Sequence, residues 1–245
     1  MKSKSQPTGI LYLIPSPLGD NPPYEVLPIS IKKVLSTLDH FIVENEKMAR
    51  RFIKKMIPQK NQEELVLYPL NKFTAQEEVN SYLDSCLKGI SMGLFSDAGC
   101  PGIADPGAVI VTKAHQHAII VKPLVGPSSI VLAMMSSGMN GQNFAFNGYL
   151  PIDKKQRSQA LLKFQRKAVK ENQAQLFIET PYRSDTLFTE MTKTLDSDTR
   201  LCVACDVSLE TEFIKTHSIA EWKKIKPNLN KRPCIFIIEW STPYR

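Results

Sequence analysis

The chain has 245 residues, which is long for one domain and short for three, so we expect two compact domains. Hydrophobic residues make up 42% and charged residues 22% of the chain, a globular composition that excludes wholesale disorder. No apolar run approaches the roughly 20 residues that a membrane span needs. Residues 1–7 lack the apolar segment of a secretory signal, which predicts a cytoplasmic protein.

Strand and helix patterns alternate over the first half of the chain. Strands are expected at 9–14, 40–43, 65–68, 90–95 and 119–122, and helices at 26–38, 46–56, 74–87 and 105–117. In the last of these helices Asp105 is the expected N-cap and Pro106 the first helical residue. Alternation at this rhythm predicts a mostly parallel sheet that is covered by helices on both faces.

The second half has a different pattern. Helices are expected at 128–137, 154–170, 184–195 and near Ala220, and strands at 143–149, 174–179, 200–207, 210–216 and 234–240. Two adjacent strands and a terminal one indicate a mixed sheet with antiparallel pairs. The Pro- and Gly-containing segment 123–127 marks the boundary, so the predicted α/β domains are 1–123 and 124–245.

The net charge of +7 is concentrated in one acid-free run, Lys154–Lys170, since the rest of the chain has 24 basic and 24 acidic residues. A second acid-free run, Lys47–Lys55, places its basic residues on one helix face, with Met48, Phe52 and Met56 on another. Each run could be a solvated helix face that aids solubility. Two such runs in one chain also fit a polyanionic partner such as RNA.

The five cysteines are an odd number and do not suggest a disulfide framework. Cys202 and Cys205 have the CxxC spacing but lie within an expected strand, where residues three apart point to opposite faces. We therefore interpret them as buried thiols. His115 and His117 are two apart on an expected helix and cannot face one ligand together, so no metal site is predicted.

Nine of the 11 glycines lie between Gly89 and Gly148, and the densest stretch is Ser96–Gly107. This stretch leaves an expected strand and enters an expected helix, which is where open α/β sheets bind ligands. It lacks the residues of a P-loop or a dinucleotide turn. Asp97 and the surrounding backbone amides suit a ligand with polar groups, although a rigid turn capped by Asp97 is the alternative. A second loop, 126–129, opens the next helix and would face the same crevice.

Four segments together resemble one known family: Ile14–Asp20, Ser96–Gly107, Pro123–Pro127 and Phe146–Pro151. They are similar to the turns and loops of the tetrapyrrole methylase superfamily of S-adenosylmethionine-dependent methyltransferases. The resemblance is strongest to the branch that 2′-O-methylates a cytidine of small-subunit ribosomal RNA. It covers nearly the whole chain, and 179–183 also resembles a stretch of that branch.

The resemblance implies two α/β domains with S-adenosylmethionine in a cleft between them, in a homodimer. It implies that the donor is bound by Pro15, Asp97, Ala98, Gly99, Ile103, Ala104, Ser128 and Ser129. Glu179 and Arg183 would orient the acceptor as catalytic residues, and a structural salt bridge between them is the alternative.

The chain departs from the branch at the acceptor-side motifs, at 44–47, 205–209 and 232–233. Three functions remain open: a ribosomal RNA methyltransferase, a methyltransferase for a small molecule such as a tetrapyrrole, and a non-catalytic relative that binds the donor or RNA. The basic runs favour the first, because a small substrate does not need them.

Overall fold

The computed structural model describes residues 7–240, which fall into two compact units that meet between Ser128 and Ser129. The N-terminal residues that suggested the absence of a secretory signal lie almost entirely outside this range. Within the described residues, no helix has the length and apolar composition to cross a membrane.

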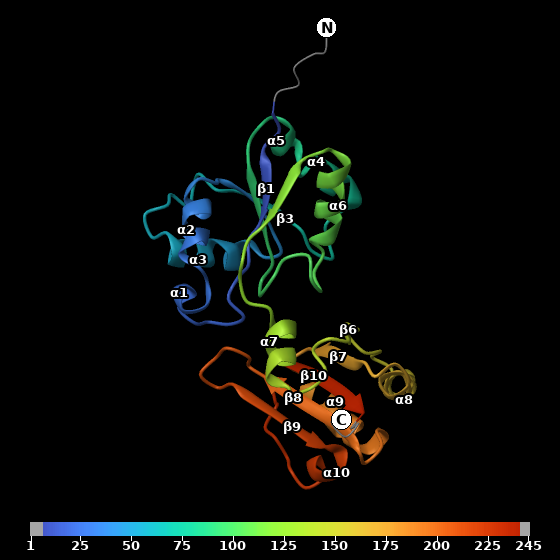
Figure 1. Ribbon diagram of the computed structural model, residues 1–245. Coiled ribbons are helices and arrows are strands. Elements are labelled where there is room, and N and C mark those ends of the chain that lie inside the picture. Colours follow the sequence, from blue (N-terminus) through green and yellow to red (C-terminus); the bar gives the residue numbers. More distant parts are fainter. Residues whose placement is uncertain (1–6, 241–245) are drawn as a thin grey trace. The chain divides into compact units, whose positions relative to one another are not determined.

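The first unit contains a sheet of five parallel strands (Figure 1). Along the chain they are β1 (Ile10–Leu13), β2 (His40–Val43), β3 (Val66–Pro69), β4 (Met92–Phe95) and β5 (Ile120–Pro123). Their order in the sheet is β3-β2-β4-β1-β5, and the pairing registers are all parallel. The predicted parallel sheet is therefore confirmed.

Helices cover both faces of this sheet. They are α1 (Pro23–Val26), α2 (Ile29–Ser36), α3 (Glu46–Met56), α4 (Gln76–Ser81), α5 (Asp84–Leu87) and α6 (Ala108–Gln116). One core joins α2 and α3 to the sheet through residues such as Ile31, Ile53 and Phe95. The other joins α4, α5 and α6 through residues such as Val79, Cys86 and Ile110. Burial on both faces explains why the central strands β2 and β4 are short and largely apolar, whereas the edge strands β3 and β5 are more exposed.

Two helices differ from their predicted form. The expected helix 26–38 is divided, because Pro28 takes an extended conformation and α2 begins after it. The expected helix 74–87 becomes α4 and α5. The division lies at a turn formed by Tyr82 and Leu83. The first helix starts at Gln76, after a turn in which the hydroxyl of Thr74 donates to the carbonyl of Pro69 and accepts the amide of Asn71.

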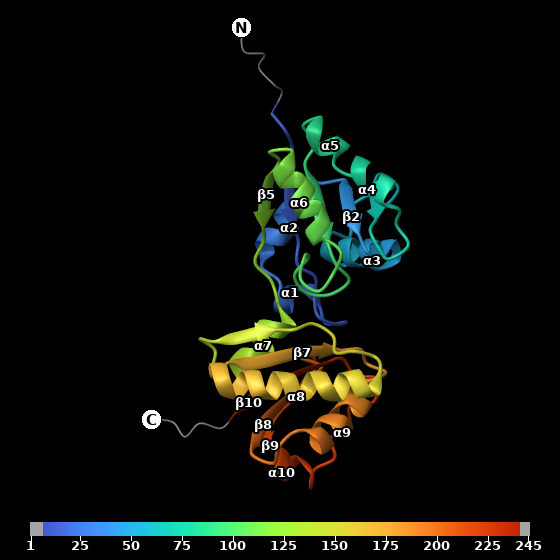
Figure 2. The ribbon, with the colours of Figure 1, turned by 90° about the vertical axis from the view of Figure 1, so that its right-hand side faces the viewer.

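The second unit contains a mixed sheet, as predicted. Its strands are β6 (Phe144–Phe146), β7 (Ala174–Glu179), β8 (Thr199–Cys205), β9 (Phe213–Ser218) and β10 (Cys234–Trp240), in the order β6-β7-β10-β8-β9. Only the β6–β7 pair is parallel. The helices are α7 (Ser129–Ser136), α8 (Lys154–Glu171), α9 (Ser184–Thr194) and α10 (Ile219–Trp222). The long helix α8 lies across the sheet (Figure 2) and packs on β7, β10 and α9.

The two residues of the CxxC spacing are buried in β8 and are free thiols. Cys205 belongs to the core under α8 and α9, whereas Cys202 is not part of it. The strand therefore directs the two sulfurs to opposite faces, as predicted. The neighbour of Cys205 is Cys234, directly opposite on the antiparallel strand β10.

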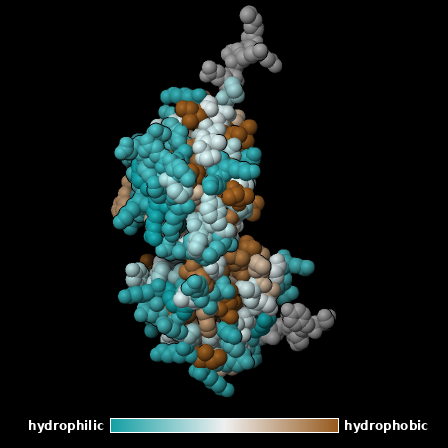
Figure 3. All heavy atoms as spheres, turned by 90° about the vertical axis from the view of Figure 1, so that its left-hand side faces the viewer, coloured by the Kyte–Doolittle hydropathy of each residue, from teal (hydrophilic) through white to brown (hydrophobic). Residues whose placement is uncertain are grey.

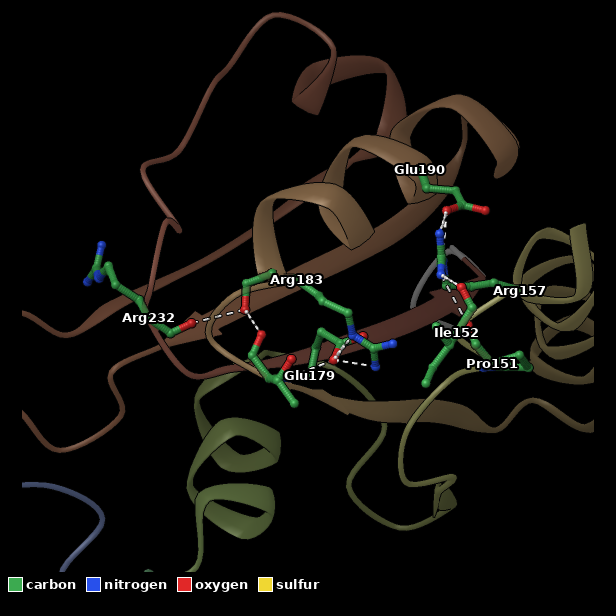
Figure 4. Close-up of polar contacts among 9 residues, drawn as sticks. Pro151, Ile152, Arg157, Glu179, Arg183, Glu190 and Arg232 are labelled. Atoms are coloured by element: carbon green, nitrogen blue, oxygen red, sulfur yellow. Dashed lines mark hydrogen bonds and ion pairs between the residues drawn. The ribbon is translucent and has the colours of Figure 1, made fainter. Parts of the chain in front are cut away.

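Arg157 is not part of the basic face that was predicted for α8. Its side chain is 9% exposed and forms an ion pair with Glu190, with Nη2–Oε2 2.6 Å and Nε–Oε2 2.7 Å (Figure 4). Its Nη1 donates to the carbonyls of Pro151 and Ile152. The sequence shows the positive charges along the helix, but it does not show that Arg157 has a buried partner on α9.

Replacing Arg157 by alanine should destabilise the second unit by about 3–5 kcal/mol, because Glu190 is left charged and buried without its partner. Urea denaturation followed by fluorescence of the buried Trp222 measures this change. Lys163→Ala on the exposed face of the same helix is the matched control and should change the free energy of unfolding by less than about 0.5 kcal/mol. Equal effects of the two variants would show that Arg157 is not needed for folding.

Candidate functional site

The carboxyl ends of the parallel strands form one edge of the first sheet. The chain leaves β1 toward one side of the sheet and leaves β4 toward the other, so the order reverses between these two neighbouring strands. Open α/β sheets bind ligands at such a reversal. The loop that follows β4 is the glycine-rich stretch Ser96–Gly107 that the sequence analysis singled out, and the loop that follows β1 belongs to the segment Ile14–Asp20 that carries the family resemblance.

These two loops are joined by their backbones. The amide of Ser16 donates to the carbonyl of Gly99 over 2.9 Å, and the amide of Gly99 donates to the carbonyl of Ser16 over 3.1 Å. The hydroxyl of Ser16 also donates to the carbonyl of Ser96 over 2.9 Å. The predicted site loops are therefore held against each other and form one surface.

The loop after β4 owes its shape to a tight turn whose polar groups are paired within it. Gly99, Gly102 and Ala104 have positive φ angles of 76°, 83° and 62°. Asp105 closes the turn, since its carboxylate accepts the amide of Gly102 over 2.8 Å and the amide of Gly107 over 2.6 Å. The expectation that Asp105 is the N-cap of a helix is wrong, because α6 begins only at Ala108.

This turn leaves four of the predicted donor-binding residues exposed: Asp97, Ala98, Ile103 and Ala104. Gly99 is buried, because its backbone takes part in the bridge to Ser16. The structure thus places Asp97, Ala98, Ile103 and Ala104 on one accessible loop. An exposed isoleucine beside exposed backbone suits contact with a flat apolar ligand group.

Three carboxylates gather at this edge of the sheet. Glu44, which follows β2, accepts the backbone amide of Asp97 over 3.0 Å. Burial raises the pKa of Glu44, and the charges of Asp97 and Asp105 raise it further. Burial likewise raises the pKa of Asp97 and of Asp105. Sequence reasoning found Asp97 but missed Glu44, although its place directly after a strand was a usable signal.

Beside this loop the first unit has a cavity of about 360 Å³. Its walls come from the turn after β1, the end of β4 and one side of α3, and they include Leu18, Met48, Phe52, Phe95 and Asp97. Met48 is 47% exposed and lines this cavity together with Phe52, so the predicted apolar face of α3 is only partly buried. The buried face of α3 consists of Ala49, Phe52, Ile53 and Met56.

The remaining predicted donor-binding residues differ in access. Pro15 is buried, and Gly126 packs so closely against it that an added Cβ would lie 2.2 Å from the Cβ of Pro15. Pro15 therefore shapes the site from beneath its surface. Ser128 and Ser129 are half-buried, and Ser129 is the first residue of α7 in the second unit.

Glu179 and Arg183 form an ion pair in the second unit, at the end of β7 (Figure 4). Oε1 of Glu179 accepts Nη2 and Nε of Arg183 over 2.7 and 3.0 Å and the amide of Thr180 over 2.6 Å. The Glu179 side chain is 1% exposed and that of Arg183 is 28% exposed. Arg183 is therefore the member of the pair that a ligand can reach, and Glu179 holds it in place.

A basic groove of the second unit was missed in the sequence. Its walls include Lys154, Lys193, Lys223 and Lys226, its floor includes Phe188 and Trp222, and its volume is about 1530 Å³. Two acidic residues also line it: Glu190, which is paired with Arg157, and Asp185. The signal was present, because residues 223–238 include five basic residues and no acidic one. The sequence analysis compared basic and acidic residues over the whole remaining chain, and the overall balance concealed this local run.

Comparison with known sequences gives relatives that span most of the chain, and no family model matches it. The ribosomal RNA small subunit methyltransferase I of Vibrio cholerae is 28% identical over 96% of this chain and 80% of that protein. The enzyme of that name from Thermotoga maritima is 27% identical over 89% of this chain and 94% of its own. The one from Halalkalibacterium halodurans is 34% identical, over 73% and 58%.

Several solved structures share the two-unit fold. The methyltransferase CobJ has a TM-score of 0.64 at 15% identity and covers 97% of both chains. The cobalt precorrin-4 methyltransferase CbiF has a TM-score of 0.56 at 15% identity, with 94% of both chains covered. A uroporphyrin-III C-methyltransferase from Thermus thermophilus, solved with S-adenosylhomocysteine, has a TM-score of 0.55 at 13% identity, over 94% of this chain and 97% of that one. At these identities the likeness is one of fold.

Replacing Glu44 by glutamine should raise the free energy of unfolding of the first unit relative to the wild type, increasingly as the pH rises above 4.5. The pKa of Glu44 in the folded unit lies above its ordinary value of 4.5, so its ionisation costs more in the folded than in the unfolded chain. Glutamine does not ionise and keeps an oxygen for the amide of Asp97. Hydrogen exchange of the β2 and β4 amides at several pH values measures this unit alone.

Glu221→Gln is the control of opposite sign. The hydroxyl and amide of Ser218 lower the pKa of Glu221, so its ionised form stabilises the second unit as the pH rises. There the wild type should gain stability over the variant. A Glu44→Gln curve parallel to the wild type at all pH values would contradict the assignment of a raised pKa.

Proposed function

The chain is a methyltransferase of the tetrapyrrole methylase superfamily, and from this premise we propose that it transfers a methyl group from S-adenosylmethionine to RNA of the small ribosomal subunit. The observation that carries the proposal is the set of curated relatives, since those from Vibrio cholerae, Thermotoga maritima and Halalkalibacterium halodurans all have names that specify this RNA. Methylation at a cytidine 2′-hydroxyl, which the resemblance implies, is part of the same proposal.

The loop after β4 fits the methyl donor. S-adenosylmethionine supplies an electrophilic methyl group on a positively charged sulfur, and it also carries an ammonium group. The carboxylates of Glu44, Asp97 and Asp105 give this edge of the sheet a negative charge that complements those groups. Of the three, Asp97 is exposed and is the one that would contact the donor, together with the backbone of Ala98, Ile103 and Ala104.

The main task of the protein in this reaction is to position the methyl donor and the acceptor. Methyl transfer is an in-line displacement, so the acceptor oxygen must be held at near-attack distance and water must be excluded. We propose that Arg183, which Glu179 holds in place, donates two parallel hydrogen bonds to a phosphate of the acceptor. Because Glu179 is buried and already accepts three hydrogen bonds, it acts through Arg183 as a positioning residue.

The basic surfaces supply the electrostatic attraction that RNA requires. On α8, after Arg157 is set aside, Lys154, Lys155, Lys163, Arg166 and Lys170 are exposed. The basic surface of α3 includes Arg50 and Lys54, whose side chains donate hydrogen bonds to the carbonyls of Gln62 and Pro58, respectively. The side of the first unit that carries α2 and α3 is largely hydrophilic (Figure 3). The lysine groove of the second unit adds a third basic surface.

The same proposal places the protein in the cytoplasm, where ribosomal RNA is modified, and in a homodimer, which the resemblance implies. Size-exclusion chromatography with light scattering measures the second point directly.

The acceptor is tested by incubating the purified protein with labelled S-adenosylmethionine and, in parallel reactions, small-subunit RNA or a tetrapyrrole. The products are analysed by mass spectrometry of the RNA nucleosides and of the tetrapyrrole. We expect a 2′-O-methylated cytidine. Label transferred to a tetrapyrrole and not to RNA would favour the small-molecule reading, and no transfer despite donor binding would favour a non-catalytic relative.

Asp97→Ala should weaken S-adenosylmethionine binding by about 1.5–3 kcal/mol, the usual cost of losing a charged hydrogen-bond partner. Isothermal titration calorimetry measures it. Asp84→Ala, which removes an exposed carboxylate from α5, is the control and should leave the affinity unchanged. Unchanged affinity in a folded Asp97→Ala variant would assign Asp97 to the turn alone.

Lys223→Glu combined with Lys226→Glu should weaken RNA binding and reduce the slope of log K against log salt concentration by about 1.4–1.8, since two phosphate contacts are lost. Lys72→Glu with Lys88→Glu changes the net charge equally, but on exposed lysines of the first unit that do not line the groove. Fluorescence anisotropy with small-subunit RNA at several salt concentrations compares the two. Equal losses would mean that only net charge matters.

A further inference from the structure

The cavity beside α3 combines apolar walls with a cationic rim. Leu18, Met48, Phe52 and Phe95 supply carbon surface, and Ser16 and Ser96 supply polar groups near its inner end. Arg51 and Lys55 line the same cavity from α3. A volume of about 360 Å³ lies within the range of small-molecule sites. Carbon walls next to paired cations are the surroundings that a nucleotide needs, with its base on one side and its phosphate on the other.

The two cations already hold one anion, the side chain of Asp20. Oδ2 of Asp20 accepts Nη2 of Arg51 over 2.9 Å, and Oδ1 accepts Nζ of Lys55 over 2.5 Å. Asp20 also lines the cavity and its side chain is 71% exposed. Its carboxylate thus stands between two cations at the rim of an apolar cavity, in the place where a phosphate group would be bound.

We propose that this cavity holds one nucleotide of the RNA acceptor, with the base against Met48, Phe52 and Phe95 and a phosphate on Arg51 and Lys55 in place of Asp20. The proposal rests on the proposed RNA methyltransferase function and deepens it. Asp20 acts as an internal competitor of the phosphate. Exposed ion pairs contribute little stability, so a phosphate that makes charge-assisted hydrogen bonds to both cations can displace it.

Charge distinguishes this occupant from the methyl donor. The donor carries a sulfonium and an ammonium, which suit the carboxylates Glu44, Asp97 and Asp105 at the ends of β2 and β4. Arg51 and Lys55 would repel those groups. Asp97 also lines the cavity. The negative surface for a cationic donor and the positive surface for an anionic acceptor therefore adjoin each other at this edge of the first sheet.

The test uses cytidine 3′,5′-bisphosphate as the probe, with the full chain and calorimetric titration. Asp20→Asn keeps the shape of the side chain but removes the competing charge, so the probe should bind about threefold more tightly. Arg51→Gln should weaken binding about tenfold, as expected for a lost charge-assisted hydrogen bond. Both side chains are exposed, so neither substitution removes a core contact.

Asp39→Asn is the matched control. Asp39 pairs with Lys60 over 2.7 Å, is exposed, lies in the same unit, and does not line the cavity. It should leave probe binding unchanged, and cytidine without phosphates should not respond to Asp20→Asn. An Asp20→Asn variant that behaves like Asp39→Asn would overturn the proposal. So would a shift of S-adenosylmethionine affinity in Asp20→Asn, which would make the donor the occupant.

The failure of this inference can be told apart from the failure of the proposed function. If the wild type methylates RNA but Asp20→Asn changes nothing, the function stands and the cavity assignment falls. If the wild type transfers no methyl group to RNA but binds the bisphosphate with the expected response to Asp20 and Arg51, the cavity assignment stands and the function falls.

Discussion

The pair of backbone hydrogen bonds between Ser16 and Gly99 is the constraint on which the first unit's site depends. It joins the loops that follow two neighbouring parallel strands, and the Ser16 hydroxyl adds a bond to the carbonyl of Ser96. Main-chain hydrogen bonds of this kind do not depend on side-chain identity. The two loops therefore keep their positions relative to each other even where their side chains vary. Asp97, Ala98, Ile103 and Ala104 are exposed because the backbone beneath them is fixed in this way.

A second set of hydrogen bonds, within the loop after β4, holds a strained backbone conformation nearby. Ala104 has a positive φ that costs an alanine free energy, and it is held there by a turn whose amides from Gly102 and Gly107 converge on Asp105. Asp105 in turn is half-buried close to Glu44, which raises the pKa of that neighbour. The loop therefore keeps a costly conformation and a costly charge together, as functional sites often do.

Much of the fold could be predicted from the sequence, and the exceptions have physical reasons. The bounds of β2, α3, β7 and β10 agree with the prediction, because apolar periodicity and terminal residues both point to them. The position of Asp97 at a strand end was also readable. The roles of Asp105 and Arg157 were not. Asp105 closes a turn with Gly102 and Gly107 instead of capping a helix, and the buried partner of Arg157 lies 33 positions away. Asp20 is the clearest case, since its two cations lie more than 30 positions away.

The order of the second sheet has a consequence for how this protein forms during synthesis. β10 is later in the sequence than every other strand of its unit, yet it lies in the middle of the sheet between β7 and β8. Until β10 has left the ribosome, β7 and β8 have no partner along one side, and their apolar faces have no complete core. The first sheet is complete as soon as β5 emerges, at an edge position. The first unit can therefore fold before the second during synthesis, and the central strand of the second sheet, β10, is the last to become available.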